Sequence, residues 1–350
     1  MARAGRWIAG FSMGLMLLWG CWLLGGDGRE RPAADGIGPG THPVAIAVEG
    51  LERRYLVHVP HAYTPARPWP VVIMFHGGGG TASQAIRETR WARKADEEGF
   101  LAVFPEGTAP DASRPSRFRD NPQTWNDGSQ RSSVGAVARN VPDVRFVSRM
   151  IEDLKRRFRV DQDRVYVTGF SNGASMAFRV ARELSPLIAA AAPVAGSDWT
   201  DKQPERPVPL LYMTGTSDPL NPIAGGEIRI GRKVFGEKPA TREMIDRWVR
   251  MAGFTDEAKA VHAGNGVIRT SYARGGAPPD IVLYVLQGHG HHWPNGSSSL
   301  PESLAGPNLA RIDATDIIWE FFKAHPIAHE AGERDAKPAG GSPSRRGDRR

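Results

Sequence analysis

The stretch from Val165 to Ala177 constrains the fold of this chain more than any other. A β-branched run leads into Gly-Phe-Ser-Asn-Gly at positions 169–173, and small or apolar residues follow at helical spacing. This pattern predicts a strand, a sharp turn at Ser171 and a helix, the arrangement of a nucleophile elbow. A serine in a strained backbone conformation needs very small neighbours two positions away, which Gly169 and Gly173 provide. The alternative is an ordinary turn in which Ser171 caps the helix.

Short apolar runs alternate with amphipathic segments along most of the chain. Such runs are typical of strands buried on both faces, so they predict an α/β fold: a mainly parallel sheet covered by helices on both sides. The expected strands are Ala45–Val48 and Arg54–Val59, paired as a hairpin, then Val71–Phe75, Leu101–Phe104, Ile188–Val194, Val208–Met213 and Ile281–Leu286. Beside the helix after Ser171, the expected helices cover 83–98, 241–252 and 313–324, and one more begins at 144.

The ends of the chain differ in composition from its middle. We divide it into a signal peptide or membrane anchor over 1–26, a linker over 27–42, a catalytic domain over 43–325 and a disordered basic tail over 326–350. Leu-Trp-Gly-Cys at 18–21 resembles a lipoprotein cleavage box, although Trp19 replaces a small residue. A lipid on Cys21, an uncleaved anchor and a cleaved signal are therefore all open. Each predicts a protein that is secreted, periplasmic or attached to the envelope membrane.

The charge does not indicate a nucleic-acid partner. The net charge is +7, but residues 331–350 contribute +3 and residues 1–30 contribute +1. No basic stripe interleaved with aromatic residues is found of the kind that follows a phosphate backbone. Cys21 is the only cysteine, so no disulfide within the chain is possible.

Three polar positions follow expected strands in the order serine, aspartate, histidine, as in α/β-hydrolases. A serine nucleophile needs a base within hydrogen-bond reach and an acid that orients the base. Asp218 is the acid candidate, because Asp280 precedes its strand and would lie at the opposite edge of the sheet. The base is one of His289, His291 and His292, and spacing does not choose among them. A zinc site is the alternative for this cluster, but no further ligand stands out, so neither metal nor cofactor is expected.

His-Gly-Gly-Gly-Gly at 76–80 follows an expected buried strand. A glycine loop in that place supplies one backbone amide to an oxyanion hole, and the residue after the nucleophile supplies the other. We assign these amides to Gly78 and Asn172, with Gly77 as the alternate for the loop, and expect a structural role for His76. A phosphate loop is not indicated, because no Lys-Ser or Lys-Thr follows the glycines.

Taken together, several motifs between residues 45 and 324 resemble the esterase family of polyhydroxybutyrate depolymerases and feruloyl or acetylxylan esterases. These are Tyr-Leu-Val-His-Val-Pro at 55–60, Phe-His-Gly at 75–77, Trp-Asn-Asp-Gly at 125–128, the motif at 169–173, Pro-Val-Ala-Gly at 193–196, Gly-Thr-Ser-Asp at 215–218 and Gly-His-His-Trp-Pro at 290–294.

This resemblance implies a serine esterase with an α/β-hydrolase fold, an ester substrate that includes polymers, and His291 as the base. Trp125 and Trp293 are expected either to line the acyl site or to pack in the core. The chain departs from many relatives at Gly78-Gly79-Gly80, where they have Cys-Gly-Gly, and at Pro142-Asp143-Val144, where they have Asp-Asp-Val. Both places are expected to border the substrate. A serine peptidase and a non-catalytic binding protein on the same fold are the alternatives.

Overall fold

A computed structural model describes residues 37–328 except 119, 231–232, 256–258 and 310. The predictions for residues 1–26, for most of the linker and for the tail from 329 lie outside the described residues. In the described part, no helix is both long enough and apolar enough to cross a bilayer.

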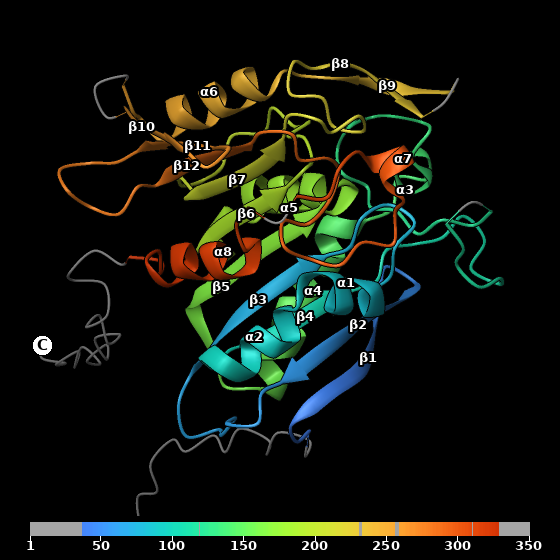
Figure 1. Cartoon of the computed structure of the whole chain (residues 1–350). Helices are drawn as coiled ribbons and strands as arrows, with labels where there is room; N and C mark the ends of the chain where they lie inside the picture. Colours follow the sequence, from blue (N-terminus) through green and yellow to red (C-terminus); the bar gives the residue numbers. More distant parts are fainter. Residues whose placement is uncertain (1–36, 119, 231–232, 256–258, 310, 329–350) are drawn as a thin grey trace, which may run out of the picture.

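Ten strands form one sheet, in the order β1-β2-β4-β3-β5-β6-β7-β12-β11-β10 (Figure 1). The six strands from β4 to β12 in this order run parallel, and the flanking strands are antiparallel. The bounds are β1 Gly40–Val48, β2 Leu51–Val59, β3 Trp69–Phe75, β4 Leu101–Pro105, β5 Val160–Phe170, β6 Ala190–Val194, β7 Leu210–Gly215, β10 Lys259–Gly264, β11 Val267–Tyr272 and β12 Ile281–Leu286. The predicted mainly parallel sheet is confirmed.

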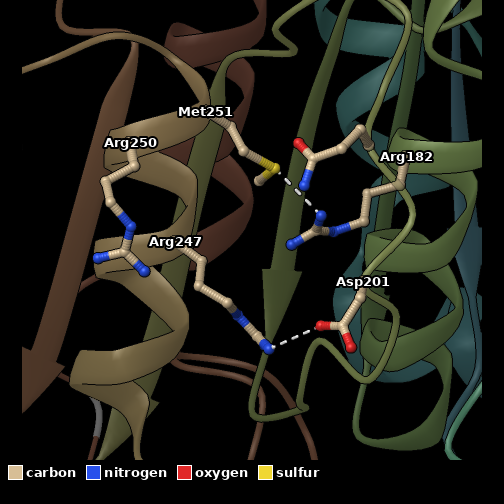
Figure 2. A pocket seen from close by; sticks show the side chains of 6 residues that line it. Arg182, Asp201, Arg247, Arg250 and Met251 are labelled. Carbon is tan, nitrogen blue, oxygen red and sulfur yellow. Dashed lines mark hydrogen bonds and ion pairs between the residues drawn. The ribbon is translucent and has the colours of Figure 1, made fainter.

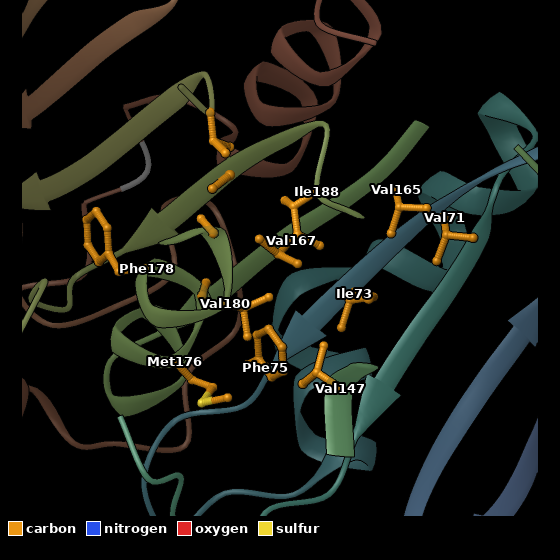
Figure 3. Close-up of a cluster of buried hydrophobic side chains, with 14 of the residues drawn as sticks. Val71, Ile73, Phe75, Val147, Val165, Val167, Met176, Phe178, Val180 and Ile188 are labelled. Atoms are coloured by element: carbon orange, nitrogen blue, oxygen red, sulfur yellow. The ribbon is translucent and has the colours of Figure 1, made fainter. Parts of the chain in front are cut away.

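Helices cover both faces of the sheet. They are α1 Ala82–Thr89, α2 Trp91–Glu98, α3 Gly135–Ala138, α4 Asp143–Arg157, α5 Asn172–Glu183, α6 Thr241–Met251, α7 Glu302–Ala305 and α8 Ala314–Lys323, with a 3-10 turn at Ser185–Leu187. β3 shows why the core has two halves, because its side chains alternate between them. Val71, Ile73 and Phe75 belong to the cluster of buried residues that includes α4 and α5 (Figure 3), whereas Val72 and Met74 belong to the cluster that includes α1, α2 and α8. This alternation follows from the two-residue period of a strand.

Several boundaries differ from the sequence-based prediction. The helix predicted over 83–98 is two helices, because Arg90 adopts a left-handed conformation with φ of 60° between α1 and α2. β1 begins at Gly40, inside the predicted linker, because its pairing with β2 extends to the Gly40–Val59 pair.

Four strands have no counterpart in the prediction. β10 and β11 extend the main sheet next to β12, and their solvent-exposed and half-buried residues lack the apolar runs used to find strands. β8 (Gly226–Ile230) and β9 (Lys233–Lys238) form a separate two-stranded sheet between β7 and α6 in the chain. Figure 1 shows this hairpin on the same side of the molecule as α3 and α7.

A buried ion pair joins β2, the second strand of the sheet, to α4. The Arg53 guanidinium in β2 donates to Asp143 Oδ1 at 2.6 Å, and both side chains are almost completely buried. The other carboxylate oxygen of Asp143 accepts the backbone N–H of Asn126 at 2.7 Å. Asp143 therefore holds the loop before α4 from the interior, and the expectation that it borders the substrate is not supported by its position.

Replacing Arg53 by Met should lower the free energy of unfolding by about 3–5 kcal/mol, because Asp143 is then a buried charge without its cation. Arg54→Met is the matched control, since Arg54 is exposed and pairs with exposed Glu52. It should cost less than about 1 kcal/mol. Urea denaturation of both variants measures the difference, and equal losses would contradict this role for the Arg53–Asp143 pair.

Candidate active site

Ser171 lies at a sharp turn between β5 and α5. Its backbone has φ of 57° and ψ of −122°, an unusual conformation for a residue with a side chain. The flanking glycines explain how the turn packs: a Cβ on Gly173 would collide with the carbonyls of Phe75 and His76, and one on Gly169 would collide with the Gly173 carbonyl. The turn is held by the Ser171 N–H, which donates to the Val194 carbonyl at 3.0 Å. The predicted strand, strained turn and helix are thus present.

The glycine loop after β3 lies against this turn. A Cβ on Gly77 would be 3.4 Å from Ser171 Cβ, and one on Gly78 would be 3.6 Å from Asn172 Cβ. Asn172 is the first residue of α5, where a helix leaves its N–H groups without partners. Within the described residues, the N–H groups of Gly78 and Asn172 donate no hydrogen bond to the protein. The two amides predicted for an oxyanion hole are therefore close together and free.

His76 fixes the shape of this loop. Its Nε2 accepts the N–H of Gly107 at 3.0 Å, so the proton is on Nδ1, which donates to the Gly77 carbonyl at 2.8 Å. Burial lowers the pKa of His76 to about 4, so the ring is neutral at physiological pH. The indole N–H of Trp125 donates to the His76 carbonyl at 2.9 Å. His76 thus holds backbone groups of the glycine loop and of its neighbours in place, which is the structural role expected for it.

His291 and Asp218 form a buried pair. His291 Nδ1 is 2.8 Å from Asp218 Oδ2, and both side chains are 3% exposed or less. Asp218 follows β7, and its Oδ1 accepts the backbone N–H groups of Leu220 and Asn221, each at 2.8 Å. The ring of Phe170, the residue before Ser171, packs on the His291 ring with centroids 4.8 Å apart. The structure therefore brings the predicted base and acid together beside the serine turn.

The two neighbouring histidines have other partners. His289 Nδ1 accepts the N–H of Leu309 at 3.1 Å, and its Nε2 donates to the His292 carbonyl at 3.1 Å. Burial lowers the pKa of His289. His292 contacts Ser298 Oγ and the Gly306 carbonyl, each at 2.8 Å. Both rings hold the loop after β12, and no three possible metal-ligating side chains converge anywhere in the part of the chain that the structure describes.

Trp125 and Trp293 lie in the interior. Trp125 is completely buried and packs on Phe75 with ring centroids 5.3 Å apart. Trp293 is 3% exposed and donates its indole N–H to Thr315 Oγ1 at 3.0 Å. Of the two alternatives for these residues, their burial supports packing rather than lining of the acyl site.

Asn172 was expected to act only through its backbone amide, whereas its side chain also forms hydrogen bonds. Its Nδ2 donates to the Trp125 carbonyl at 3.2 Å and to Asp127 Oδ2 at 2.8 Å, and its Oδ1 accepts the Trp125 N–H at 2.7 Å. Asp127 is completely buried and also accepts from Arg131 at 3.0 Å. This network ties the long loop before α4 to the serine turn. The proximity of the Trp-Asn-Asp-Gly and Gly-Phe-Ser-Asn-Gly motifs arises only in the fold.

Phe118 is a second residue that the sequence did not indicate. Its ring is 52% exposed and lies against Gly79 of the glycine loop. The segment that carries it is ordered by Asn121, whose buried amide bonds the backbone of Asp111, Arg114 and Pro115. The sequence around Phe118 has no hydrophobic periodicity, so a single phenylalanine there did not indicate a contact with the glycine loop.

A cavity of about 360 Å³ lies elsewhere, between α5 and α6 (Figure 2). Arg182 in its wall is eleven residues after Ser171, which places it about 16 Å away along the helix axis. The Arg182 guanidinium is already bound to Asp198 and to the Lys202 carbonyl. The cavity therefore has no part in the arrangement around Ser171. It is lined by Arg182, Asp201, Gln203, Arg247, Arg250 and Met251.

Known proteins resemble this chain in sequence and in fold. Feruloyl esterase B of Piromyces equi is 30% identical over 249 residues, which cover 68% of this chain and 42% of that enzyme. Poly(3-hydroxyalkanoate) depolymerase C of Paucimonas lemoignei is 24% identical over 288 residues, 76% of this chain and 65% of that enzyme. The chain thus spans less than two thirds of the length of either relative.

Among solved structures, the acetyl xylan esterase from Aspergillus awamori has a TM-score of 0.55 at 15% identity, over 81% of this chain and 99% of that chain. Together with the strand order, this likeness confirms the predicted α/β-hydrolase fold. The sequence profile of the Dienelactone hydrolase family matches residues 59–239, just over half of the chain.

The Asn172 network gives a test that depends on pH. Asn172→Ala should lower the free energy of unfolding by about 1–3 kcal/mol at any pH from 5 to 8, because buried partners lose their hydrogen bonds. Asn172→Asp should cost more at pH 8 than at pH 5. It places a carboxylate against Asp127, so the folded variant binds a proton more readily than the unfolded chain and gains stability as the pH falls. Denaturant titrations at both pH values measure this. An Asp variant as stable as the parent at pH 8 would contradict the network.

Proposed function

The chain belongs to the dienelactone hydrolase family, whose profile matches residues 59–239. We infer the reaction from this family membership together with the geometry of the site. We propose that the chain is a serine esterase in which Ser171 is the nucleophile, His291 the base and Asp218 the acid. The observation that carries the proposal is the buried hydrogen bond between His291 and Asp218 beside the strained turn at Ser171. The relatives named as esterases and as a depolymerase support ester hydrolysis as the chemistry.

In the proposed first half-reaction, Ser171 Oγ attacks the ester carbonyl while His291 Nε2 takes its proton. A neutral imidazole whose Nδ1–H is bound by a carboxylate has its Nε2 lone pair free for this role. The Asp218 carboxylate is held by two backbone N–H groups, so it keeps the ring in one orientation and stabilises the imidazolium that forms. His291 then returns the proton to the leaving alcohol oxygen.

The oxyanion that forms on the carbonyl oxygen is assigned to the amides of Gly78 and Asn172. Their free N–H groups are fixed before substrate arrives, the loop by His76 and the other amide by the start of α5. Donors of this kind stabilise charge without reorganising during the reaction. In the second half-reaction, water gives a proton to His291 and attacks the acyl-enzyme carbonyl. His291 then returns that proton to Ser171 Oγ as the acyl–oxygen bond breaks and the carboxylic acid leaves.

For the substrate, we propose short hydroxyalkanoate esters, as in polyhydroxybutyrate, with feruloyl or acetyl esters of plant polysaccharides as the alternative. The names of the two relatives support hydroxyalkanoate esters and feruloyl esters. We place Phe118 at the edge of the substrate site, because its half-exposed ring lies on Gly79. Action outside the cytoplasm is proposed from the N-terminal segment, with a lipid on Cys21 as one form of attachment.

Ser171→Ala should lower the hydrolysis of a short p-nitrophenyl ester about 10⁴-fold or more, because the covalent route is lost. His291→Ala should lose activity to a similar extent. His289→Ala and His292→Ala should keep most of it at temperatures where they are folded, since the hydrogen bonds given for these rings go to backbone groups and Ser298. Circular dichroism confirms folding for each variant. An active Ser171→Ala protein, or a dead His292→Ala protein beside an active His291→Ala protein, would contradict the assignment.

A side-by-side rate comparison separates the substrate classes. We expect hydroxybutyrate oligomers to be cleaved faster than methyl ferulate or acetylated xylan, and a p-nitrophenyl ester faster than the anilide of the same acyl group. Product release followed by chromatography measures all of these. Faster cleavage of methyl ferulate or acetylated xylan would favour the alternative substrates, and faster cleavage of the anilide would indicate a peptidase.

A further inference from the structure

The segment 123–127 contacts both parts of the site that carry the oxyanion amides. It precedes α3 in the chain and lies outside the helices and strands. Trp125 at its centre is completely buried, and its ring packs on Phe75, the last residue of β3. Backbone that is buried without regular secondary structure needs other partners for its polar groups. Here the partners belong to the glycine loop on one side and to α5 on the other.

Two hydrogen bonds join this segment to the glycine loop, one on each side of Gly78. The Trp125 indole N–H donates to the His76 carbonyl at 2.9 Å. The Gly79 N–H donates to the Gln123 carbonyl at 2.6 Å. Gly78 thus lies between two anchored residues, while its own N–H donates to no group in the described part of the chain. These two bonds therefore restrict how the Gly78 amide can rotate.

The same segment is bonded to the first residue of α5. Asn172 Oδ1 accepts the Trp125 N–H at 2.7 Å, and Asn172 Nδ2 donates to the Trp125 carbonyl at 3.2 Å and to Asp127 Oδ2 at 2.8 Å. About two turns further along α5, Arg179 Nη1 donates to the Asn126 carbonyl at 2.7 Å. Because both N–H donors of the Asn172 side chain are occupied within the protein, this side chain anchors α5 rather than donating to a substrate.

The segment is itself fixed from the interior. The Asn126 N–H donates to Asp143 Oδ2 at 2.7 Å, and Asn126 Nδ2 donates to the Val141 carbonyl at 2.9 Å. Asp143 is in turn paired with Arg53 of β2. A loop that moved freely would not fix the positions of two other elements, whereas this one is tied to β2 and to the start of α4.

We propose that residues 123–127 are a brace that fixes the two oxyanion amides relative to each other, with Trp125 as a positioning residue. The inference rests on the proposed function, in which the N–H groups of Gly78 and Asn172 stabilise the oxyanion. The close packing at Gly173 brings the glycine loop and α5 together, and the brace then fixes how their amides are oriented. Such donors act only where they meet the oxygen of the transition state, and a misplacement of about 1 Å can lower the rate about 100-fold.

Trp125→Phe tests the brace, because it removes the bond to the His76 carbonyl and keeps an aromatic ring next to Phe75. It should lower kcat for a short p-nitrophenyl ester about 10- to 100-fold and change KM less than about threefold, because the amides act on the transition state. A trifluoromethyl ketone adds to a nucleophilic serine and forms an adduct that carries an oxyanion. Its inhibition constant should rise by the factor by which kcat/KM falls.

Trp69→Phe is the matched control. Trp69 is also completely buried, donates its indole N–H to the Thr64 carbonyl at 2.7 Å and packs on the ring of Tyr63 with centroids 5.3 Å apart. It is the first residue of β3, about 20 Å from the end that leads into the glycine loop. This variant should lose stability, as Trp125→Phe does, and keep the kcat and the inhibition constant of the parent.

Unchanged kcat and unchanged inhibition by the ketone in folded Trp125→Phe protein would overturn the proposal, as would the same losses in Trp69→Phe. If Trp125→Phe does not fold, Asn172→Ala replaces it, since this variant keeps the backbone amide and loses the side-chain bonds to the brace. It should show the same pattern. The failures are distinguishable: a ketone that does not inhibit the parent, or an active Ser171→Ala enzyme, refutes the serine mechanism. A ketone that inhibits the parent and the Trp125→Phe variant equally refutes only the brace.

Discussion

The close approach of α5 to the ends of β3 and β5 is the constraint on which the rest of the site depends. Gly173 lies directly against the carbonyls of Phe75 and His76, and Gly169 lies against Gly173, where no side chain fits. This approach forces the positive φ of Ser171 and brings the start of α5 beside the glycine loop. The strain at Ser171 is therefore maintained by packing around it, and the same packing places two free amides next to the hydroxyl-bearing residue.

The other parts of the site reach this turn from separate strands of one sheet. The glycine loop follows β3, Ser171 follows β5, Asp218 follows β7 and His291 follows β12. Because these strands are parallel, their carboxyl ends lie along one edge, as expected for ligand sites of such sheets. Each part then has its own support: His76 for the glycine loop, Leu220 and Asn221 for the Asp218 carboxylate, and Asn172 for the loop at Trp125.

The parts of this account that could be predicted from sequence are those with local signals. Val71–Phe75 is a continuous apolar run and is a fully buried strand, and the glycines around Ser171 report a packing constraint that is local in the chain. β10 and β11 could not be found in this way, since β10 is mostly exposed, β11 mixes half-buried and buried positions, and neither is a continuous apolar run. Phe118 was missed for a different reason: it lies against Gly79, which is remote in the chain, and its neighbours in sequence give no sign of that contact.

A nucleophilic Ser171 becomes acylated during turnover, and a covalent label on this serine shows its reactivity. The protein would be treated with a fluorophosphonate, which reacts with activated serines, and then digested and mapped by mass spectrometry. With Ser171 as the nucleophile, we expect one adduct, on the peptide that contains Ser171. Esterase activity should fall in proportion to labelling, and Ser171→Ala protein should carry no adduct. Labelling of another residue with loss of activity, or continued ester hydrolysis by fully labelled protein, would contradict it.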